Sequence, residues 1–313
     1  MNNVVKMFGR LLLAFNGFLY DWIRFVKYNG WRKKLKSSSF RDYYNAKLYH
    51  TLEKSLSYKE QKINSGLDNS KLLLSNLSFA TTDNATFHDI VAAKVLKDFC
   101  SNKNQEFTDL LVRIPELPDF YGDCGAKTVS LESWNKSRLA EPELFFFGRS
   151  SLREYSDDVV EFDIIERALK LANKTPSSCN MQPWHTYLIN NQEKLKAAID
   201  IQSGNRGFGD KIKGLLIITV DQTAFISSSE RYQHWIDGGM YSMSVVYALH
   251  SLGVASCCLN WSEDPRRDKL LRKTLGIKNE HSIMMMISYG WPDDTNKVCV
   301  SPRKPIESML SII

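Results

Sequence analysis

Two stretches of this chain decide its fold: RSSLR at residues 149–153 and PSSCNMQPW at residues 176–184. In an extended segment alternate side chains share one face, so the first stretch points Arg149, Ser151 and Arg153 to one side. Two guanidiniums around a hydroxyl suit a phosphate, because arginine offers forked donors that match phosphate oxygens. The second stretch is dense in small hydroxyl and amide side chains, which suit the edge of a polar heterocycle. Together they predict a site for a phosphorylated, flat, ring-containing cofactor.

Further landmarks follow these stretches in a set order. WIDGGM at 235–240 opens a long apolar helix, DP at 264–265 begins another helix, and a buried strand over 283–289 ends in a Gly-Trp-Pro turn. With this series, roughly residues 145 to 307 resemble the FMN-dependent nitroreductase family. The most specific element of the resemblance is the Pro-Ser-Ser-x-Asn-x-Gln-Pro-Trp pattern of residues 176–184.

The resemblance implies a homodimer that binds FMN and carries hydride from NADH or NADPH to a small organic acceptor. The arginines and Ser151 would hold the phosphate and ribityl chain, and the loop of residues 176–182 would line the ring. The cofactor-binding residues implied in this way are Arg149, Ser151, Arg153, Pro176, Ser177, Ser178, Asn180, Gln182, Asn260, Trp261 and Arg303. No catalytic side chain and no metal are implied, because the flavin carries the redox chemistry. Arg231 and His234 are candidates for the pocket wall.

The chain departs from the family pattern in three places. Cys179 lies where the family has small residues, so it is either a thiol near the ring or an inert buried cysteine. The stretch between Asp221 and Gln233 is short, whereas many members carry a helical excursion there that covers the flavin and selects substrates. The sequence therefore does not predict the residues of the substrate pocket. The first half of the chain has no counterpart in the minimal family fold.

The pattern of apolar residues predicts an α+β fold with a mixed sheet flanked by helices over residues 141–313, preceded by a mostly helical region over residues 1–140. In the second region, Asp158 is expected to cap one helix, and Asp264 and Gly276 to begin and end another. The expected helices are 38–65, Ile90–Phe99, Glu161–Asn173 and Trp235–Leu252. The expected strands are Thr186–Ile189, Gly214–Val220, Ile283–Tyr289 and a carboxyl-terminal Ser308–Ile313 that crosses to the partner subunit.

The composition is that of a globular protein, with 43% hydrophobic and 24% charged residues among 313. The net charge of +6 is compatible with an anionic cofactor or a membrane surface, but no basic stripe interleaved with aromatics indicates nucleic acid. The six cysteines form no C-x-x-C pair and no cluster with zinc spacing. Free thiols in a reducing, cytoplasmic setting are therefore expected.

The amino terminus carries an apolar run at residues 11–20, after Lys6 and Arg10. The run is too short to span a bilayer, and no small-residue cleavage site follows it. Three interpretations stay open: a helix that packs on the core or on a partner, a helix that lies on a membrane surface through residues 8–36, and a signal or anchor.

Three functions compete at this stage. The first is an FMN-dependent NAD(P)H oxidoreductase, and the absence of a G-x-G-x-x-G motif leaves NADH and NADPH undistinguished. The second is a pathway-specific flavoenzyme of surface-polysaccharide biosynthesis, which the long first half favours. The third is a non-enzymatic interaction protein that retains the fold, since fold alone does not fix function.

Overall fold

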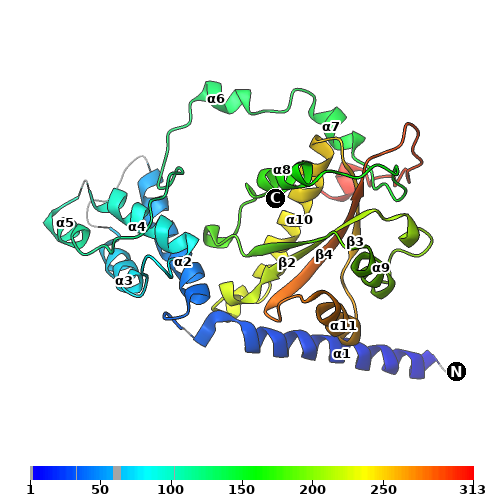
Figure 1. Cartoon of the computed structure of the whole chain (residues 1–313), viewed down its shortest axis with the longest axis horizontal. Helices are drawn as coiled ribbons and strands as arrows, with labels where there is room; N and C mark the ends of the chain where they lie inside the picture. Colours follow the sequence, from blue (N-terminus) through cyan, green and yellow to red (C-terminus); the bar gives the residue numbers. More distant parts are fainter. Residues whose placement is uncertain (1–2, 33, 59–64, 102) are drawn as a thin grey trace.

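A computed structural model describes residues 3–32, 34–58, 65–101 and 103–313, and it confirms an α+β fold (Figure 1). One sheet of four antiparallel strands has the order β1-β2-β4-β3. Its strands are β1 (Trp184–Ile189), β2 (Gly214–Asp221), β3 (Ala255–Asn260) and β4 (His281–Gly290). The three strands expected in the interior of the second half are present, each slightly longer than the apolar run that predicted it.

Helices cover both faces of the sheet. The side chains of β2 alternate between them: Leu216 and Ile218 pack in one apolar cluster with the helix α10, whereas Leu215 and Ile217 pack in a second cluster with α9 and α11. Burial on both faces explains why β2 is continuously apolar. The helices that cover the sheet are α8 (Phe162–Ala172), α9 (Gln192–Ile201), α10 (Gln233–Ser251) and α11 (Pro265–Leu275).

The expected caps of α11 are confirmed, whereas the expected cap of α8 is wrong. The Asp264 carboxylate accepts hydrogen bonds from the backbone N–H groups of Arg266 and Arg267, at 2.8 and 3.1 Å, and Gly276 ends α11 in a left-handed conformation at φ 71°. Asp158 does not cap α8, because the residue before the first residue of that helix is Glu161, three residues after Asp158.

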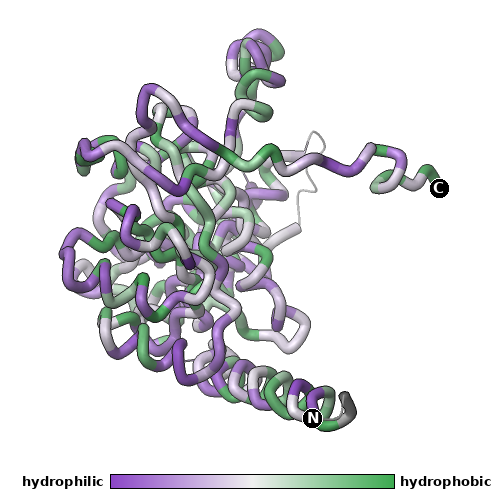
Figure 2. The backbone as a smooth tube through the Cα atoms, turned by 90° about the vertical axis from the view of Figure 1, so that its right-hand side faces the viewer, coloured by the Kyte–Doolittle hydropathy of each residue, from purple (hydrophilic) through white to green (hydrophobic). Residues whose placement is uncertain are grey.

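Within the single chain the expected carboxyl-terminal strand is absent: a 3-10 turn occupies Ile306–Ser308, and residues 309–313 form no strand. Its expected pairing with a partner subunit stays a prediction, because one chain does not test it. This segment extends away from the body of the chain (Figure 2), so its backbone has no neighbouring strand to pair with. The other 3-10 turns of the described chain are η1 (Gly30–Arg32), η2 (Ser178–Asn180), η3 (Gly209–Lys211), η4 (Gln222–Ala224) and η5 (Ser228–Glu230).

The amino-terminal region is helical, as expected. The predicted helix over 38–65 ends at Ser57, and residues 59–64 of that prediction lie outside the described residues. The predicted Ile90–Phe99 helix lies within α4. The helices of this region are α1 (Asn3–Tyr28), α2 (Ser38–Ser57), α3 (Leu67–Leu77), α4 (Phe87–Cys100), α5 (Gln105–Leu111) and α6 (Leu131–Lys136). The short helix α7 (Pro142–Gly148) begins the second region.

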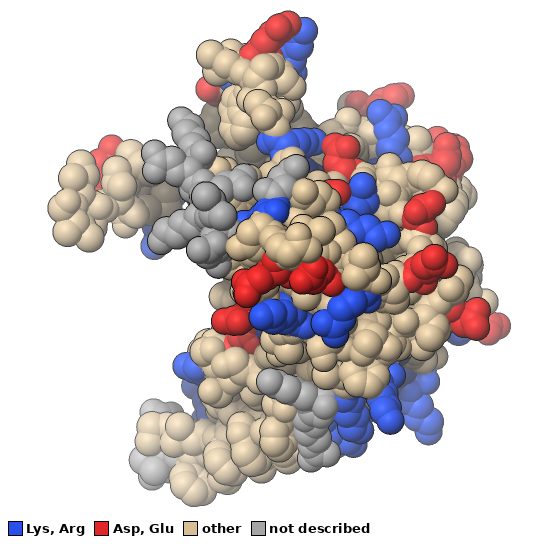
Figure 3. All heavy atoms as spheres, turned by 90° about the vertical axis from the view of Figure 1, so that its left-hand side faces the viewer, with Lys and Arg blue, Asp and Glu red and all other residues tan. Residues whose placement is uncertain are grey.

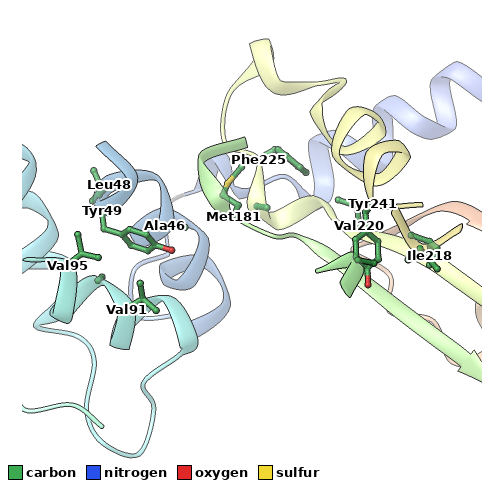
Figure 4. Packing of buried hydrophobic residues seen from close by; sticks show 14 of the residues in the cluster. Ala46, Leu48, Tyr49, Val91, Val95, Met181, Ile218, Val220, Phe225 and Tyr241 are labelled. Carbon is green, nitrogen blue, oxygen red and sulfur yellow. The ribbon is translucent and has the colours of Figure 1, made fainter. Parts of the chain in front are cut away.

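A buried ion pair ties α2 to α4. The Arg41 guanidinium and the Asp89 carboxylate are 2.8 Å apart and fully buried, and Asn45 donates a further hydrogen bond to the same carboxylate. The apolar packing of α2 and α4 continues through Met181 into the sheet (Figure 4). The helical region and the sheet therefore share one continuous core.

Candidate functional site

The first predicted stretch lies beside the edge strand β3. Ser151 forms a parallel bridge with Ser256, and the Leu152 N–H donates to the Ser256 carbonyl at 3.2 Å. Leu152 is buried, whereas Ser151 and Arg153 are half-buried and line a cavity of about 640 Å³ together with Arg149. The alternation expected for an extended segment is present at residues 151–153, where Leu152 is buried and its neighbours line the cavity, whereas Ser150 lines the cavity together with Arg149.

Arg303 reaches this cavity from the carboxyl-terminal segment. Its guanidinium donates to the Ser301 carbonyl, and Arg153 donates to the Cys299 sulfur at 3.5 Å. The residues lining the cavity include three arginines and no carboxylate, and the ion pairs found among the described residues involve none of these three arginines. The cavity thus offers positive charge and guanidinium donors without an internal anion.

Two thiols lie close to this cluster. Burial raises the pKa of Cys257, against a smaller lowering by Arg153, and burial likewise raises the pKa of Cys258. Both thiols are therefore protonated at neutral pH, and neither supplies an anion that would compete for the arginines.

The second predicted stretch forms a strained loop before β1. Three residues without the freedom of glycine have positive φ: Cys179 at 50°, Asn180 at 52° and Gln182 at 49°. Such residues cost of order 1–3 kcal/mol each and persist where the surroundings hold them, which is common at ligand-binding sites. Within the loop, the Ser177 hydroxyl accepts the Gln182 N–H at 2.9 Å.

The helix α10 holds the loop from one side. The Ser178 N–H donates to the Asp237 carboxylate at 3.2 Å, and the Gln233 amide donates to the same carboxylate at 2.8 Å. Asp237 is fully buried, and this burial raises its pKa even though the two donors favour the ionised form. The loop backbone is therefore fixed to the first turn of α10.

The amino-terminal helices hold the same loop from the other side. His88 on α4 lies between two partners, the Met181 carbonyl at 3.2 Å from Nε2 and the Tyr49 hydroxyl at 2.8 Å from Nδ1. Burial lowers the pKa of His88, so the ring is neutral. A neutral ring that donates from Nε2 to the carbonyl must accept from the hydroxyl at Nδ1. Sequence reasoning missed both residues, because neither belongs to a motif.

The two stretches lie at opposite corners of the sheet (Figure 1). The arginine stretch adjoins β3 at Ser256, which pairs with Tyr289, whereas the loop leads into β1 at Trp184, which lies level with Val220 and Ser282. Four strand spacings across the sheet, from Ser151 through β3, β4 and β2 to β1, and seven residues along it give a separation of roughly 30 Å. The structure therefore does not bring the two predicted halves of the site together within one chain.

The other predicted site residues are placed as follows. Asn260 is exposed at the far end of β3, about 13 Å from Ser256 at the usual rise of a strand. Trp261 is buried on the opposite face and donates to Asp268 at 3.0 Å. Cys179 packs against the apolar core, and Pro176 is exposed. The two candidates for the pocket wall also differ, since Arg231 is exposed and His234 is buried.

Comparisons with known proteins agree with this architecture. Residues 147–234 match the model of the nitroreductase family. An Archaeoglobus fulgidus protein named "Putative NADH dehydrogenase/NAD(P)H nitroreductase" is 29% identical over 152 residues, which cover 47% of this chain and 83% of that protein. The 4-nitrobenzoate reductase of a Nocardioides species is 23% identical, with 53% of this chain and 87% of that protein covered.

Solved structures similar to this chain include proteins described as nitroreductases. A structure described as an FMN-dependent nitroreductase from Clostridium difficile has a TM-score of 0.43 and 23% identity, over 50% of this chain and 90% of its own. The family model matches residues 147–234, and each of these curated relatives is similar to about half of the chain. Residues 147–234 are therefore similar to the nitroreductase family.

Proposed function

We propose that the chain binds FMN and transfers hydride from NADH or NADPH to a small organic acceptor. The observation that carries the proposal is the cavity in which Arg149, Ser151, Arg153 and Arg303 meet without a carboxylate. The names of the curated relatives, as NAD(P)H nitroreductase and 4-nitrobenzoate reductase, support the donor and the class of acceptor.

The residues present fit the phosphate end of FMN. A dianionic phosphate would satisfy guanidiniums that have no anionic partner among the described residues, and the Ser151 hydroxyl lies between two of them along the strand. When bound, the flavin supplies the two-electron chemistry. The chain's own groups would bind and orient it.

The proposal includes a homodimer. A ribityl chain of five carbons cannot bridge the roughly 30 Å between the arginine cavity and the loop of residues 176–182 within one chain. A two-fold partner can bring its own loop to the cavity, which completes two equivalent sites. Exposed apolar side chains on α10 and on the carboxyl-terminal segment supply a surface for that contact: Trp235, Ile236, Met240, Met243, Ile306, Met309, Leu310 and Ile312.

We also propose that residues 1–140 and 141–313 are two regions with different roles. The second region carries the cofactor, and the first holds the ring loop through His88 and Tyr49. All six cysteines are free, which supports a cytoplasmic location. A non-enzymatic protein that retains the fold is less well supported, because its unused arginines would be expected to pair with local carboxylates.

Purification followed by an absorption spectrum tests the cofactor. Wild-type protein is expected to carry FMN and to be reduced by NADH or NADPH. Arg149→Gln and Arg153→Gln are each expected to lower FMN affinity by about tenfold or more, because a charged hydrogen bond contributes about 1.5–3 kcal/mol. Arg266→Gln, at an arginine on α11 whose side chain is 96% exposed, is the matched control. Wild-type protein that takes up no added FMN would refute the proposal.

Complementation tests the shared site. Arg149→Gln damages the phosphate cavity, and Ser178→Phe blocks the loop. If each site uses the cavity of one chain and the loop of the other, unfolding and refolding an equal mixture of the two variants restores about a quarter of the wild-type flavin, because half of the dimers are mixed and one site in each is intact. Flavin that stays absent from a folded, dimeric mixture contradicts a shared site.

A further inference from the structure

The long helix α1 meets the body of the protein with its polar side. The Tyr20 hydroxyl donates to Asp268 at 2.6 Å, and the Arg24 guanidinium donates to the carbonyls of Asn279 and His281 at 2.9 and 3.0 Å. Arg24 is buried, and it lies one turn from Tyr20 on the same helical face. These bonds fix the rotation of α1 about its axis, which runs along the lower margin of the molecule (Figure 1).

The opposite side of α1 is apolar and points to solvent. Residues 8, 15 and 22 recur at the spacing of two helical turns, and all three are aromatic: Phe8 is 61% exposed, Phe15 65% and Trp22 61%. Further exposed members of this face are Leu11, Leu12, Phe18, Leu19 and Ile23. Monomeric proteins rarely leave so large a contiguous apolar surface uncovered, so this one marks an interaction site.

Positive charge lies on the side of α1 that faces away from this apolar face. On α1, the exposed cations are Lys6, Arg10 and Lys27, against a single acid, Asp21. On the neighbouring helix α11, the ammonium of Lys269 lies 5.3 Å from the centre of the Tyr20 ring. The lower margin of the molecule shows Lys and Arg side chains without Asp or Glu (Figure 3).

A helix of this composition fits the surface of a bilayer. Interfacial helices combine Phe, Leu and Trp on one face with Lys and Arg on the other, and they lie in the plane of the headgroups. In the described part of the chain, no helix has the length and apolarity that crossing a membrane requires. We propose that α1 lies flat on an anionic lipid surface, with its apolar face in the bilayer and the cations of α1 and α11 at the headgroups.

A second copy of the chain suits this face less well. A two-fold contact along α1 would place the same basic margin of both copies side by side, where like charges repel. Lipid headgroups of opposite charge instead attract that margin. The inference is independent of the proposed oxidoreductase activity, because none of the residues that carry it lines the arginine cavity or the ring loop.

Sedimentation with vesicles tests the inference on the full-length protein. Vesicles of phosphatidylcholine mixed with phosphatidylglycerol are expected to pull down the wild type, and vesicles of phosphatidylcholine alone to bind it much less. Phe15→Glu is expected to lower binding at least tenfold, because it puts a charge in the apolar face. Val112→Glu, at a residue that is 86% exposed elsewhere, is the matched control and is expected to bind as the wild type does.

Lys6→Gln and Arg10→Gln are each expected to lower binding to the anionic vesicles by about fivefold, the effect of one cation near the surface. Circular dichroism and bound flavin show whether each variant is folded. Wild-type protein that stays in the supernatant with anionic vesicles overturns the proposal. A folded Phe15→Glu variant that still binds the vesicles also overturns it. A wild-type oligomer that Phe15→Glu dissociates overturns it as well, because that outcome assigns the apolar face to a second copy of the chain.

Discussion

Replacing Tyr49 by phenylalanine tests whether the helical region supports the ring loop. The change deletes one hydroxyl and leaves the shape of the ring in place. In the wild type this hydroxyl lies 2.8 Å from Nδ1 of His88, whose Nε2 lies 3.2 Å from the Met181 carbonyl, and all three residues are buried. Tyr49→Phe therefore leaves a buried acceptor nitrogen without its donor.

The magnitude follows from the cost of that orphaned nitrogen. A buried polar group that loses its partner costs about 1–3 kcal/mol, so we expect the free energy of unfolding to fall by about 2 kcal/mol. The loop also holds three residues at positive φ, which only its surroundings keep in place. If His88 is one of the groups that keep them there, FMN affinity falls as well, by up to about tenfold for a loss of 1.4 kcal/mol at the loop.

Urea denaturation gives the free energy of unfolding, and titration of the apoprotein with FMN gives the affinity. Tyr121→Phe is the matched control, because this tyrosine is 95% exposed. A Tyr49→Phe protein whose stability stays within about 0.5 kcal/mol of the wild type would refute the hydrogen-bonded relay. Lost stability with unchanged FMN affinity would show that the relay supports the fold and not the loop.

Three further changes probe the fold. Arg41→Met leaves the buried Asp89 carboxylate unpaired and is expected to lower the free energy of unfolding in urea by about 3–5 kcal/mol, whereas stability close to that of the wild type would contradict the buried pair. Asp264→Ala removes the cap of α11 and is expected to cost about 1 kcal/mol in the same assay; Asp264→Asn, which keeps an acceptor, should cost less. Burial lowers the pKa of His234 from 6.5 to about 4. Between pH 6.5 and pH 4 the unfolded chain therefore binds a proton that the folded chain does not. The free energy of unfolding falls as the pH drops through this range, by up to about 1.4 kcal/mol per pH unit. Urea unfolding at pH 7 and pH 5 measures this loss, which His234→Gln should reduce.

Local patterns in the sequence predicted local structure well. The alternation in residues 151–153 predicted which side chains share a face, because side-chain direction in an extended segment depends only on position. The cap at Asp264 and the left-handed turn at Gly276 followed from the chemistry of single residues. The apolar run of β2 predicted a strand buried on both faces, which the two clusters of the core confirm.

Predictions that needed a distant partner were less reliable. The carboxyl-terminal residues 308–313 have an apolar composition typical of a strand, yet no strand of the described chain lies beside them. The relay to the loop joins Tyr49 to His88 across 39 residues and His88 to Met181 across 93. No spacing rule connects positions so far apart, and Tyr49 by itself is one more apolar residue on a helical stripe.

By itself, then, the sequence determined the α+β class, the two stretches that resemble a flavin site, and the apolar run at residues 11–20, because each depends on neighbours within a few residues. Only the tertiary structure decided where those features lie. Strand order and register put the two stretches at opposite corners of the sheet, a long-range outcome of pairing. The apolar face of an amphipathic helix usually packs on the core, but that of α1 points outward. Tyr20 and Arg24 on the opposite face donate hydrogen bonds to Asp268 and to the His281 carbonyl, which only the folded chain brings close to α1.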